Sequence, residues 1–458
     1  MRELAREILL ATLAEVDVAR AFDRKLERRP STALPSTSLR AGGTGGGTLH
    51  FGCESVDLEA FKHIWVVSFG KAAWATFAAL REALGEQYQP ERGVVVSNVP
   101  VQPVPLGFLA FQGGHPVPNA GSLEAAGAVL RLLGEADEKT LVFFLISGGG
   151  SALMEKPFDY AQGKPLAKSL SLDDMQKLNR LLVGCGASID EINAIRKHLS
   201  AIKGGRLVEG APQAHKVTFL LSDVPEGRPA TIASGPTLPD PSTVETCYEV
   251  VARYKLLGKF PSAVRDLFQK KKLRETPKEG AEAFRRSQTF VVLSNHDVLH
   301  AAHRAAGARG FLVECEMCCD DWELPRAAEF LFGRLEEMQK QNPGQPVALI
   351  SGGEILVKVT GDGQGGRNQT FVLHCVEKIA GRERAVLSAG TDGIDGNSPA
   401  AGAVADGETL TRAREKGLDP QDYFRRSDSF RFFQPLDDAI LIGPQQNNLR
   451  DLRLLLAR

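Results

Sequence analysis

The sequence lacks an excess of charge of either sign and lacks any apolar run long enough to cross a bilayer. Its formal net charge is −1, which gives no reason to expect nucleic acid or a charged membrane surface as a partner. A membrane-spanning helix needs about 20 consecutive apolar residues, and no such run is present. At the amino terminus, Arg2, Glu3, Arg6 and Glu7 interrupt the apolar core that a signal peptide would need. Residues 1–28 instead have the apolar spacing of an amphipathic helix.

Cysteine is too sparse and too scattered for a disulfide framework. The seven cysteines are an odd number, which fits reduced thiols in a cytoplasmic protein. Cys315, Cys318 and Cys319 form a C-x-x-C-C motif, but no second C-x-x-C or nearby histidine pair completes a zinc site. We interpret these three as small buried or neutral residues and leave a metal or redox role open.

Two nucleotide-binding motifs are also missing. The Walker A pattern G-x-x-x-x-G-K-[ST] is absent, and the one G-x-G-x-x-G stretch, residues 361–366, has no ribose-binding acid placed as a dinucleotide fold requires. That glycine-rich stretch is better interpreted as a flexible loop that presents Arg367 to a phosphate group.

The most informative pattern that is present occurs twice. The apolar run 141–146 leads into Ser147–Ser151 (S-G-G-G-S), and the apolar run 347–350 leads into Ser351-Gly352-Gly353-Glu354. Short unbroken apolar runs are typical of strands buried on both faces, as in parallel sheets. Glycines directly after such strands can expose backbone N–H groups to an anion. The pattern predicts two α/β domains that handle phosphate.

Other segments fill in the organisation of the chain, whose 458 residues exceed one ordinary core. The strands predicted in the first half are 64–69, 93–97, 141–146 and 216–221, with helical patterns between them. We predict an N-terminal domain over 1–245, a charged linker over 246–288 and a C-terminal domain over 289–458. Strands predicted in the C-terminal domain are 290–293, 347–350, 355–359 and 385–389. Residues 30–48, rich in Pro, Ser, Thr and Gly, are predicted to form a loop.

A helix over 188–205 is predicted by an S-x-x-E capping box at Ser188 and by an apolar stripe that ends before Gly204-Gly205. Asn193, Arg196 and Lys197 lie on the neighbouring stripe. This stripe suits either the wall of an anion-binding cleft or an ordinary solvated helix face, and the spacing does not separate the two.

Single residues at strand ends give weaker signals. Lys71 follows the first strand, where an ammonium group could meet a phosphate or simply lie on the surface. Asp223 follows the strand 216–221 and could act as a general base or form a turn. His115, alone in its turn, is more often structural than catalytic. Asp392 lies in a glycine-rich acidic loop that suits Mg²⁺.

Taken together, these stretches resemble one family, the class II glycerate kinases (glycerate 2-kinases), whose C-terminal half is called the MOFRL domain. The matches run in family order along nearly the whole chain. They are S-F-G-K-A-A (68–73), G-G-H-P-V-P-N-A-G (113–121), L-I-S-G-G-G-S-A-L (145–153), I-N-A-I-R-K-H-L-S-A-I-K-G-G-R-L (192–207), L-S-D-V (221–224), I-A-S-G-P-T-L-P-D-P (232–241), L-I-S-G-G-E (349–354), G-G-R-N-Q (365–369) and G-T-D-G-I-D-G (390–396).

The resemblance implies an α/β fold with a Rossmann-like N-terminal domain and a MOFRL C-terminal domain. Each domain is expected to hold a mostly parallel sheet flanked by helices, with the active site in the cleft between the domains. The implied reaction is phosphorylation of D-glycerate by ATP and Mg²⁺ to give 2-phosphoglycerate. The partners are thus glycerate and ATP, and we expect a monomer or homodimer.

The resemblance, together with the chemistry above, assigns roles to particular residues. Lys71 and Arg367 are expected to stabilise the transferred phosphoryl group, and Asp223 to orient or deprotonate the attacking hydroxyl. The expected substrate-binding residues are Ser147, Gly148, Gly149, Gly150, Ser151, Asn193, Arg196 and Lys197. The expected nucleotide-binding residues are Gly352, Gly353, Gly365, Gly366 and Asn368, and the expected metal ligands are Asp392 and Glu354.

Three stretches depart from the family pattern. Residues 31–48 replace a strand-like segment, 157–165 look like additional loop, and 443–448 replace a Gly-Thr-Asn-type turn, so no role is assigned to that turn. The competing hypotheses are an NAD(P)H-dependent hydroxypyruvate reductase, a kinase for another small hydroxy acid, and a non-catalytic sugar-phosphate binder.

Overall fold

The computed structural model describes residues 1–29, 47–158 and 170–458. These residues form two compact units. The central unit consists of residues 22–292, and the terminal unit combines residues 1–21 with 293–458. Each unit is described by itself below.

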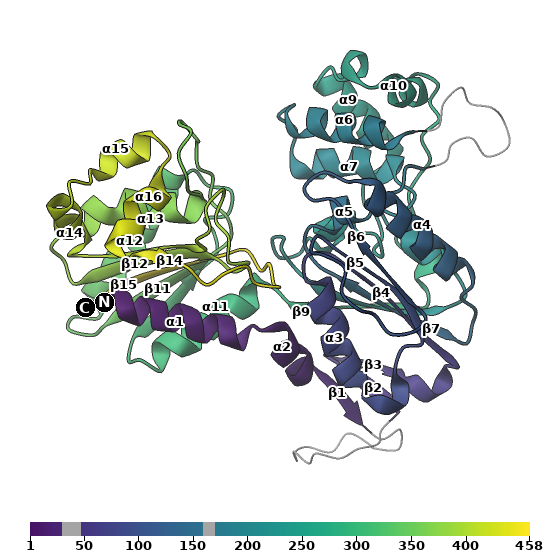
Figure 1. Ribbon diagram of the computed structural model, residues 1–458, viewed down its shortest axis with the longest axis horizontal. Helices are drawn as coiled ribbons and strands as arrows, with labels where there is room; N and C mark the ends of the chain where they lie inside the picture. Colours follow the sequence, from purple (N-terminus) through teal and green to yellow (C-terminus); the bar gives the residue numbers. More distant parts are fainter. Residues whose placement is uncertain (30–46, 159–169) are drawn as a thin grey trace. The chain divides into compact units, whose positions relative to one another are not determined.

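A six-stranded sheet in the order β6-β5-β4-β7-β8-β9 forms the middle of the central unit (Figure 1). The pairs among its first five strands are all parallel, as predicted from their apolar runs. Every residue of β7 is buried, which agrees with a strand covered on both faces. The strands are β4 (His63–Phe69), β5 (Arg92–Ser97), β6 (Phe108–Gln112), β7 (Thr140–Ile146), β8 (His215–Leu221) and β9 (Ser287–Leu293).

Helices pack on this sheet and also form a second small core. The apolar faces of α3 and α4 lie against the sheet, whereas α6, α7, α9 and α10 share their own cluster of buried side chains. A three-stranded antiparallel sheet, β1-β2-β3, completes the unit. The bounds are α2 (Val18–Lys25), α3 (Ala73–Leu84), α4 (Ala120–Gly134), α5 (Gly150–Leu153), α6 (Leu172–Val183), α7 (Ile189–Leu199), α8 (Arg206–Glu209), α9 (Val244–Arg253), α10 (Ser262–Gln269), β1 (Leu26–Arg29), β2 (Thr48–Phe51) and β3 (Glu54–Asp57).

The sheet of the terminal unit has the order β10-β11-β15-β12-β13-β14 and is mostly antiparallel, so the prediction of a mostly parallel sheet is wrong here. Only β10 and β11 pair in parallel, because the last strand, β15, runs antiparallel between β11 and β12. A buried apolar run fits a central strand of either direction, so the sequence pattern could not distinguish them. The strands are β10 (Leu312–Glu316), β11 (Val347–Gly352), β12 (Arg384–Gly390), β13 (Gly402–Asp406), β14 (Ala439–Ile440) and β15 (Asp451–Ala457).

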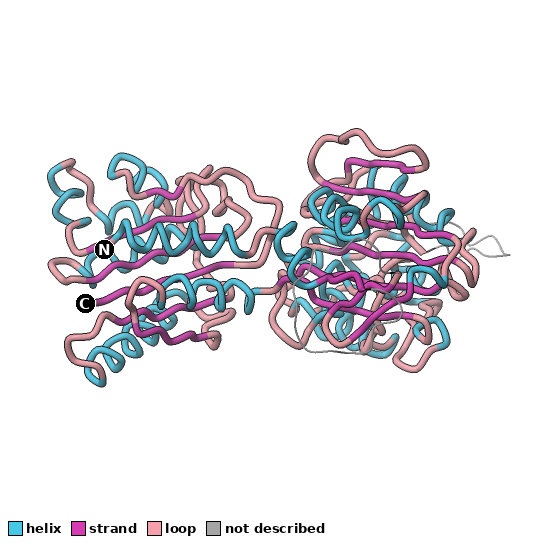
Figure 2. Tube along the Cα trace, turned by 90° about the horizontal axis from the view of Figure 1, so that it is seen from below, coloured by secondary structure: helices cyan, strands magenta, loops and turns pink. Residues whose placement is uncertain are grey.

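Helices cover both faces of the terminal sheet, and one of them comes from the amino terminus of the chain. In Figure 1, α1 and α11 lie side by side on one face, and α12 and α13 lie on the other. Figure 2 shows both chain ends in this unit. The helices are α1 (Arg2–Glu15), α11 (Asn295–Gly307), α12 (Leu324–Gln341), α13 (Arg367–Ile379), α14 (Thr409–Glu415), α15 (Pro420–Arg425) and α16 (Ser429–Phe433).

The division into units differs from the predicted domain boundaries. Residues 246–288, predicted as a linker, contain most of α9 and all of α10, whose apolar faces are buried in the central unit. Strand β9, predicted to open the second domain, lies beside β8 in the central sheet. The predicted strand 355–359 is a loop with a single bridge at Leu356. The many charged residues around 269–288 led to the prediction of a linker, although the packed helices α9 and α10 lie directly before them.

Two predicted loops fall largely outside the described residues. These are the Ser/Thr/Gly-rich stretch, of which 30–46 are not described, and the additional loop at 157–165, of which 159–165 are not described. Across the described ranges, no helix combines the length and apolar character needed to span a membrane.

Candidate functional site

The carboxyl ends of β4 and β7 are joined by a tight set of backbone contacts in the central unit. Ser147 donates its amide to the Phe69 carbonyl (3.1 Å), and Lys71 donates its amide to the Gly148 carbonyl (2.9 Å). The Ser147 hydroxyl accepts from the Ala72 amide at 3.0 Å. A side chain at Gly70 would collide with Ser147, which explains a glycine at this close approach. The backbone of Lys71 is therefore fixed beside the S-G-G-G-S turn, and its contact with a phosphoryl group stays a prediction.

The same turn lies beside both Asp223 and Lys71, two residues that were predicted to act in catalysis. A Cβ atom at Gly148 would collide with the carboxylate of Asp223, and one at Gly149 would lie 3.3 Å from Cγ of Lys71 and 3.0 Å from the ring of His115. The two glycines thus leave room for three ionisable side chains around one turn. We call Lys71, His115, Ser147–Ser151 and Asp223 the β7-turn group.

His115 belongs to this group, although a lone histidine in a turn gave no reason to expect it. Burial, and secondarily the charge of Lys71, lowers the pKa of His115 below its ordinary value. This shift favours the neutral ring, which can donate or accept hydrogen bonds without adding positive charge. The G-G-H-P stretch at 113–116 was the sequence signal that could have placed it here.

Helix α7 starts as the sequence predicts, with a capping box between Ser188 and Glu191, but it ends at Leu199, before Gly204-Gly205. Of the predicted stripe, Asn193 is buried, and Arg196 donates from Nε to the Asn179 side chain at 2.8 Å. Burial lowers the pKa of the Arg196 guanidinium, and Glu155 acts in the opposite direction.

Lys197 has a different position from the one predicted. It is buried and its ammonium pairs with the buried Asp240 carboxylate at 3.0 Å. Thr276 also donates to Asp240, at 2.9 Å. Because its charge is already matched inside the protein, Lys197 holds α7 in place, and its contact with substrate stays a prediction.

Three polar side chains form a chain of hydrogen bonds next to the β7-turn group. The Ser151 and Ser234 hydroxyls lie 2.9 Å apart, and Ser234 donates to Oδ1 of Asn193 at 3.3 Å. Ala233, directly before Ser234, lies close to Gly150. A Cβ atom added at Gly150 would be 2.8 Å from the Cβ atom of Ala233. The stretch 232–241 therefore contributes to this site.

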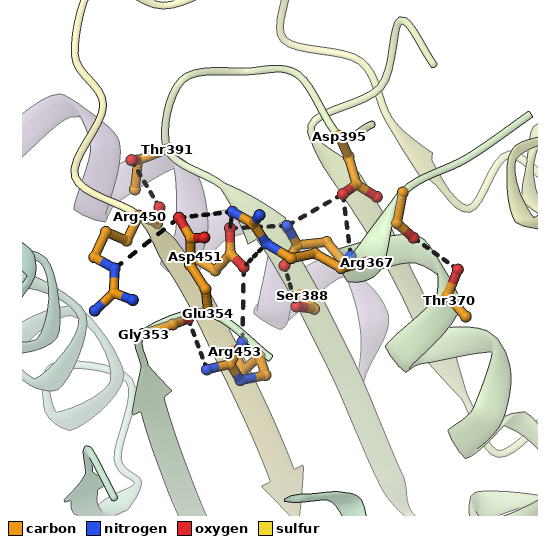
Figure 3. A network of polar contacts seen from close by, with 12 residues as sticks. Gly353, Glu354, Arg367, Thr370, Ser388, Thr391, Asp395, Arg450, Asp451 and Arg453 are labelled. Atoms are coloured by element: carbon orange, nitrogen blue, oxygen red, sulfur yellow. Dashed lines mark hydrogen bonds and ion pairs between the residues drawn. The ribbon is translucent and has the colours of Figure 1, made fainter. Parts of the chain in front are cut away.

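In the terminal unit, Arg367 is held by two carboxylates at the start of α13 (Figure 3). Its Nε and Nη2 donate to the two oxygens of Asp451 at 2.6 and 3.1 Å, and Nη2 lies 2.9 Å from Glu354. These acids raise the pKa of Arg367 above its ordinary value, against the opposing effect of burial. The guanidinium is partly exposed, so its position is fixed while it stays accessible.

The first turn of α13 is capped from a loop. Asp395 accepts hydrogen bonds from the amides of Asn368 (3.1 Å) and Gln369 (2.8 Å). Asn368 is buried and also donates to Asp451 at 3.0 Å. Asn368 therefore supports Arg367 through Asp451. Because its side chain is buried, it offers little surface for the predicted contact with nucleotide.

The second glycine turn has no exposed anion cradle, which differs from the expectation. The Gly353 amide donates to Asn295 and the Glu354 amide to Asp320, both at 2.9 Å. Arg453 donates to the carbonyls of Gly352 and Gly353. Because these groups are engaged inside the protein, the turn positions Glu354 rather than presenting free amides.

Glycines 365 and 366 also have an internal reason to be small. A side chain at Gly365 would collide with Ser429, and one at Gly366 would collide with Asp395. Contact with a nucleotide stays a prediction for these two glycines and for Gly352 and Gly353.

Of the two residues predicted to bind a metal, Asp392 suits that role better than Glu354, and both stay predictions. Within residues 1–29, 47–158 and 170–458, no group of three or more His, Cys, Asp or Glu side chains could hold a metal ion. Glu354 lies 2.9 Å from Arg367 and 4.0 Å from Arg450, so cations already neutralise it. Asp392 is half-buried, and its backbone carbonyl accepts a hydrogen bond from the Gln445 amide at 2.8 Å. A single carboxylate suits Mg²⁺ that phosphate oxygens hold in turn.

The residues that sequence reasoning missed are mostly partners of the predicted ones. Arg450 and Arg453 flank Asp451 at the start of an otherwise apolar strand, and all three are buried. Buried charges in such a strand are uncommon unless they are paired, which was a usable signal. Asp320, bonded to Arg450 at 2.5 and 2.7 Å, had no signal of its own.

Comparison with known proteins identifies the family of the chain. A family model described as a domain of unknown function, DUF4147, matches residues 4–269, and the MOFRL family model matches residues 347–451. The D-glycerate 2-kinase of Thermotoga maritima is 36% identical over 391 residues, covering 84% of this chain and 89% of the relative. A protein of Agrobacterium vitis named as a hydroxypyruvate reductase is 35% identical and covers 85% of this chain and 98% of that relative.

A solved structure extends the agreement to the whole fold. The crystal structure of glycerate kinase from Thermotoga maritima matches with a TM-score of 0.80 and 32% identity, over 100% of this chain and 99% of that one. The chain belongs to the glycerate 2-kinase family, in which a DUF4147 domain is followed by a MOFRL domain, and it is a kinase of that family.

Proposed function

We propose that the protein transfers the γ-phosphoryl group of ATP to D-glycerate and forms 2-phosphoglycerate. The observation that carries the proposal is the β7-turn group, which places Lys71, His115 and Asp223 around two glycines at the carboxyl edge of a parallel sheet. Ligands of open α/β sheets bind at that edge. The names of the relatives support the choice of glycerate.

In the proposed reaction, the 2-hydroxyl oxygen of glycerate attacks the γ-phosphorus. A new O–P bond forms, the bond from that phosphorus to the β–γ bridging oxygen breaks, and ADP leaves. The hydroxyl proton passes to the Asp223 carboxylate, which also orients the nucleophile. Lys71 neutralises charge on the moving phosphoryl group, and neutral His115 donates or accepts a hydrogen bond beside it.

Arg367 supplies a second fixed positive charge from the terminal unit. Because Asp451 and Glu354 hold its guanidinium in place, it needs little reorganisation to meet phosphoryl oxygens. Mg²⁺, when bound to ATP, would neutralise phosphate charge, and Asp392 is the residue that would hold it. Substrate oxygens would meet the Ser147–Ser151 turn and Arg196. We place the reaction in the cytoplasm, where the seven free cysteines would stay reduced.

A coupled assay of ADP release tests this function. With ATP, Mg²⁺ and D-glycerate, the wild type should release ADP in proportion to glycerate. Lys71→Ala should lower kcat by about 100-fold or more, because it removes one transition-state charge. Lys177→Ala, a change at an exposed helix residue, serves as the control and should leave kcat unchanged. Equal activity in both variants would remove Lys71 from the mechanism.

The reductase name carried by some relatives gives the alternative outcome. Oxidation of NADH with hydroxypyruvate, in the absence of glycerate-dependent ADP release, would favour it. The structure argues against that outcome, since 355–359 is not a strand and the amides that open α13 are capped by Asp395. A dinucleotide fold needs both a preceding strand and free amides there.

A further inference from the structure

A left-handed turn in the central unit is the starting point. Ala233, Ser234 and Gly235 have φ angles of 49°, 63° and 58°. Two consecutive residues with side chains in this region are uncommon, because Cβ crowds the following carbonyl group. Such conformations persist only where the surrounding structure imposes them, and they cluster at functional sites.

Neighbouring backbone imposes the conformation. Gly204 donates its amide to the Ser234 carbonyl at 3.0 Å, and Gly205 donates to the Gly235 carbonyl at 2.8 Å. Leu207 donates to the Pro236 carbonyl at 3.0 Å. These three bonds fix the turn from one side, so the backbone sets the direction of the Cα–Cβ bond of Ser234.

The hydrogen-bond chain through Ser234 favours one proton direction. Ser234 has one hydroxyl hydrogen, and the acceptor Oδ1 of Asn193 lies 3.3 Å away. When Ser234 donates to Asn193, Ser151 is the donor in the 2.9 Å contact between the two hydroxyls. Once its own hydrogen is used in this way, the Ser151 oxygen can only accept from anything else. Ser151 is half-buried, whereas Ser234 and Asn193 are buried.

We infer that Ser234 is a positioning residue that turns Ser151 into a hydrogen-bond acceptor for a hydroxyl group of the substrate. A carboxylate has no hydrogen to donate, so this acceptor discriminates in favour of a substrate O–H. In a 2,3-dihydroxy acid whose 2-hydroxyl is the nucleophile, the group read in this way is the 3-hydroxyl. The inference rests on the proposed function and adds the substrate feature that the central unit selects.

The test compares D-glycerate with D-lactate, which has the same carboxylate and 2-hydroxyl but lacks the 3-hydroxyl. A site built to bond a hydroxyl rejects the analogue without it. The wild type should therefore have a much higher kcat/KM for glycerate than for lactate. In Ser234→Gly, which keeps the left-handed backbone without strain, Ser151 loses the partner that orients its hydroxyl, and that preference should fall by about tenfold as the bond to the substrate hydroxyl weakens. The KM for ATP should stay unchanged.

Controls separate this role from a structural one. Ser234→Ala removes the same hydroxyl but keeps the strain, so it should lose the same preference and have a lower Tm than Ser234→Gly. Lys271→Gly relieves a left-handed residue (φ 49°) elsewhere and should raise Tm without changing the preference.

A wild-type glycerate preference in Ser234→Gly would overturn the inference and leave the proposed function intact. No ADP release by the wild type with glycerate would overturn both.

Discussion

At the scale of single residues, the terminal unit contains a series of mostly buried acidic and basic side chains that alternate and form ion pairs with one another. Asp320 pairs with Arg450, Arg450 approaches Glu354, and Glu354 and Asp451 both pair with Arg367. Every ion of this series except Asp320 has two oppositely charged neighbours, which offsets much of the cost of burial. The result is a guanidinium whose direction is determined before any substrate binds.

Replacing Arg367 with lysine tests this geometry. Lysine keeps the charge, but it cannot donate to both Asp451 oxygens while reaching Glu354. We expect kcat to fall by about 100-fold, the usual effect of losing one transition-state donor, with a smaller change in KM for glycerate. Arg431→Lys, at an exposed arginine that pairs loosely with Asp428, is the matched control. Equal kcat values for these variants would show that a charge alone is sufficient.

Asp395 predicts a pH dependence of stability. Burial, together with the nearby Asp451 charge, raises its pKa to about 6, although the amides of Asn368 and Gln369 oppose the shift. The neighbouring Arg367 is the facing cation. Since the folded pKa lies above the ordinary value of 3.8, the folded state binds the proton more tightly. Its contribution to the free energy of unfolding is complete below pH 4 and is lost by pH 6 to 7.

Thermal unfolding of the wild type and Asp395→Asn between pH 4 and 7 measures this effect. The stability difference, wild type minus variant, should decrease by about 2 kcal/mol as the pH rises from 4 to 7. The variant cannot titrate at this position, so any constant cost of the altered helix cap cancels in the slope. A difference that is flat, or that increases with pH, would contradict the raised pKa.

Sequence reasoning found residues whose role follows from a motif and missed those whose role follows from a partner. Lys71, Asp223 and Arg367 stand directly after glycine turns or strands, where the pattern itself suggests exposure to ligand. Asp451 and Ser234 act through contacts with segments far away in the chain. The pairing of Lys197 with Asp240 was missed for the same reason, because Asp240 is 43 residues away.

At the scale of helices and strands, continuous apolar runs were reliable and mixed runs were not. The strands β4, β5, β7, β8, β11 and β12 all occur where such runs predicted them. The run at 355–359 is mostly apolar, with Lys358 inside it, but it forms a loop after the Gly353-Glu354 turn and has one bridge between Leu356 and Glu323. Strand direction could not be predicted at all for β15, since apolar content does not encode it.

Helix α1 was predicted as an amphipathic helix, but its place in the terminal unit was not. Arg2 pairs with Asp438 at 2.8 Å, and Asn447 donates to the Val16 carbonyl at 3.2 Å. Both partners lie more than 400 residues away, and no local pattern encodes them. Only the apolar stripe, with Ile8 and Leu9 buried, was visible in the sequence.

Ile8→Ala tests whether α1 stabilises the terminal unit. Ile8 is fully buried, so truncation should cost about 2 to 5 kcal/mol in the free energy of unfolding. Amide hydrogen exchange should increase in β12, β13 and α11 and stay unchanged in the central sheet. Leu10→Ala, at a 53% exposed position of the same helix, should have little effect. Faster exchange in β4 and β7, which belong to the central unit, would contradict the assignment of α1 to the terminal unit.

At the scale of the whole molecule, the chain leaves the terminal unit after α1, builds the central unit, and returns to complete the first. The order of segments along the sequence suggested a simple division into halves, which is why the predicted boundaries at 245 and 289 differ from the observed units. What the sequence did convey is the family, because the motifs of both units occur in order along the chain. Fold class and reaction class follow from that likeness, whereas strand direction and the supporting contacts do not.

The position that is phosphorylated tests the proposed roles of Asp223 and Ser151 most directly. Phosphorus NMR of the product formed from ATP, Mg²⁺ and D-glycerate distinguishes the two monophosphates. The account predicts 2-phosphoglycerate, since Asp223 is assigned to the 2-hydroxyl and Ser151 to the 3-hydroxyl. A product that is entirely 3-phosphoglycerate would contradict this assignment, and the absence of any phosphorylated glycerate would contradict the proposed reaction itself.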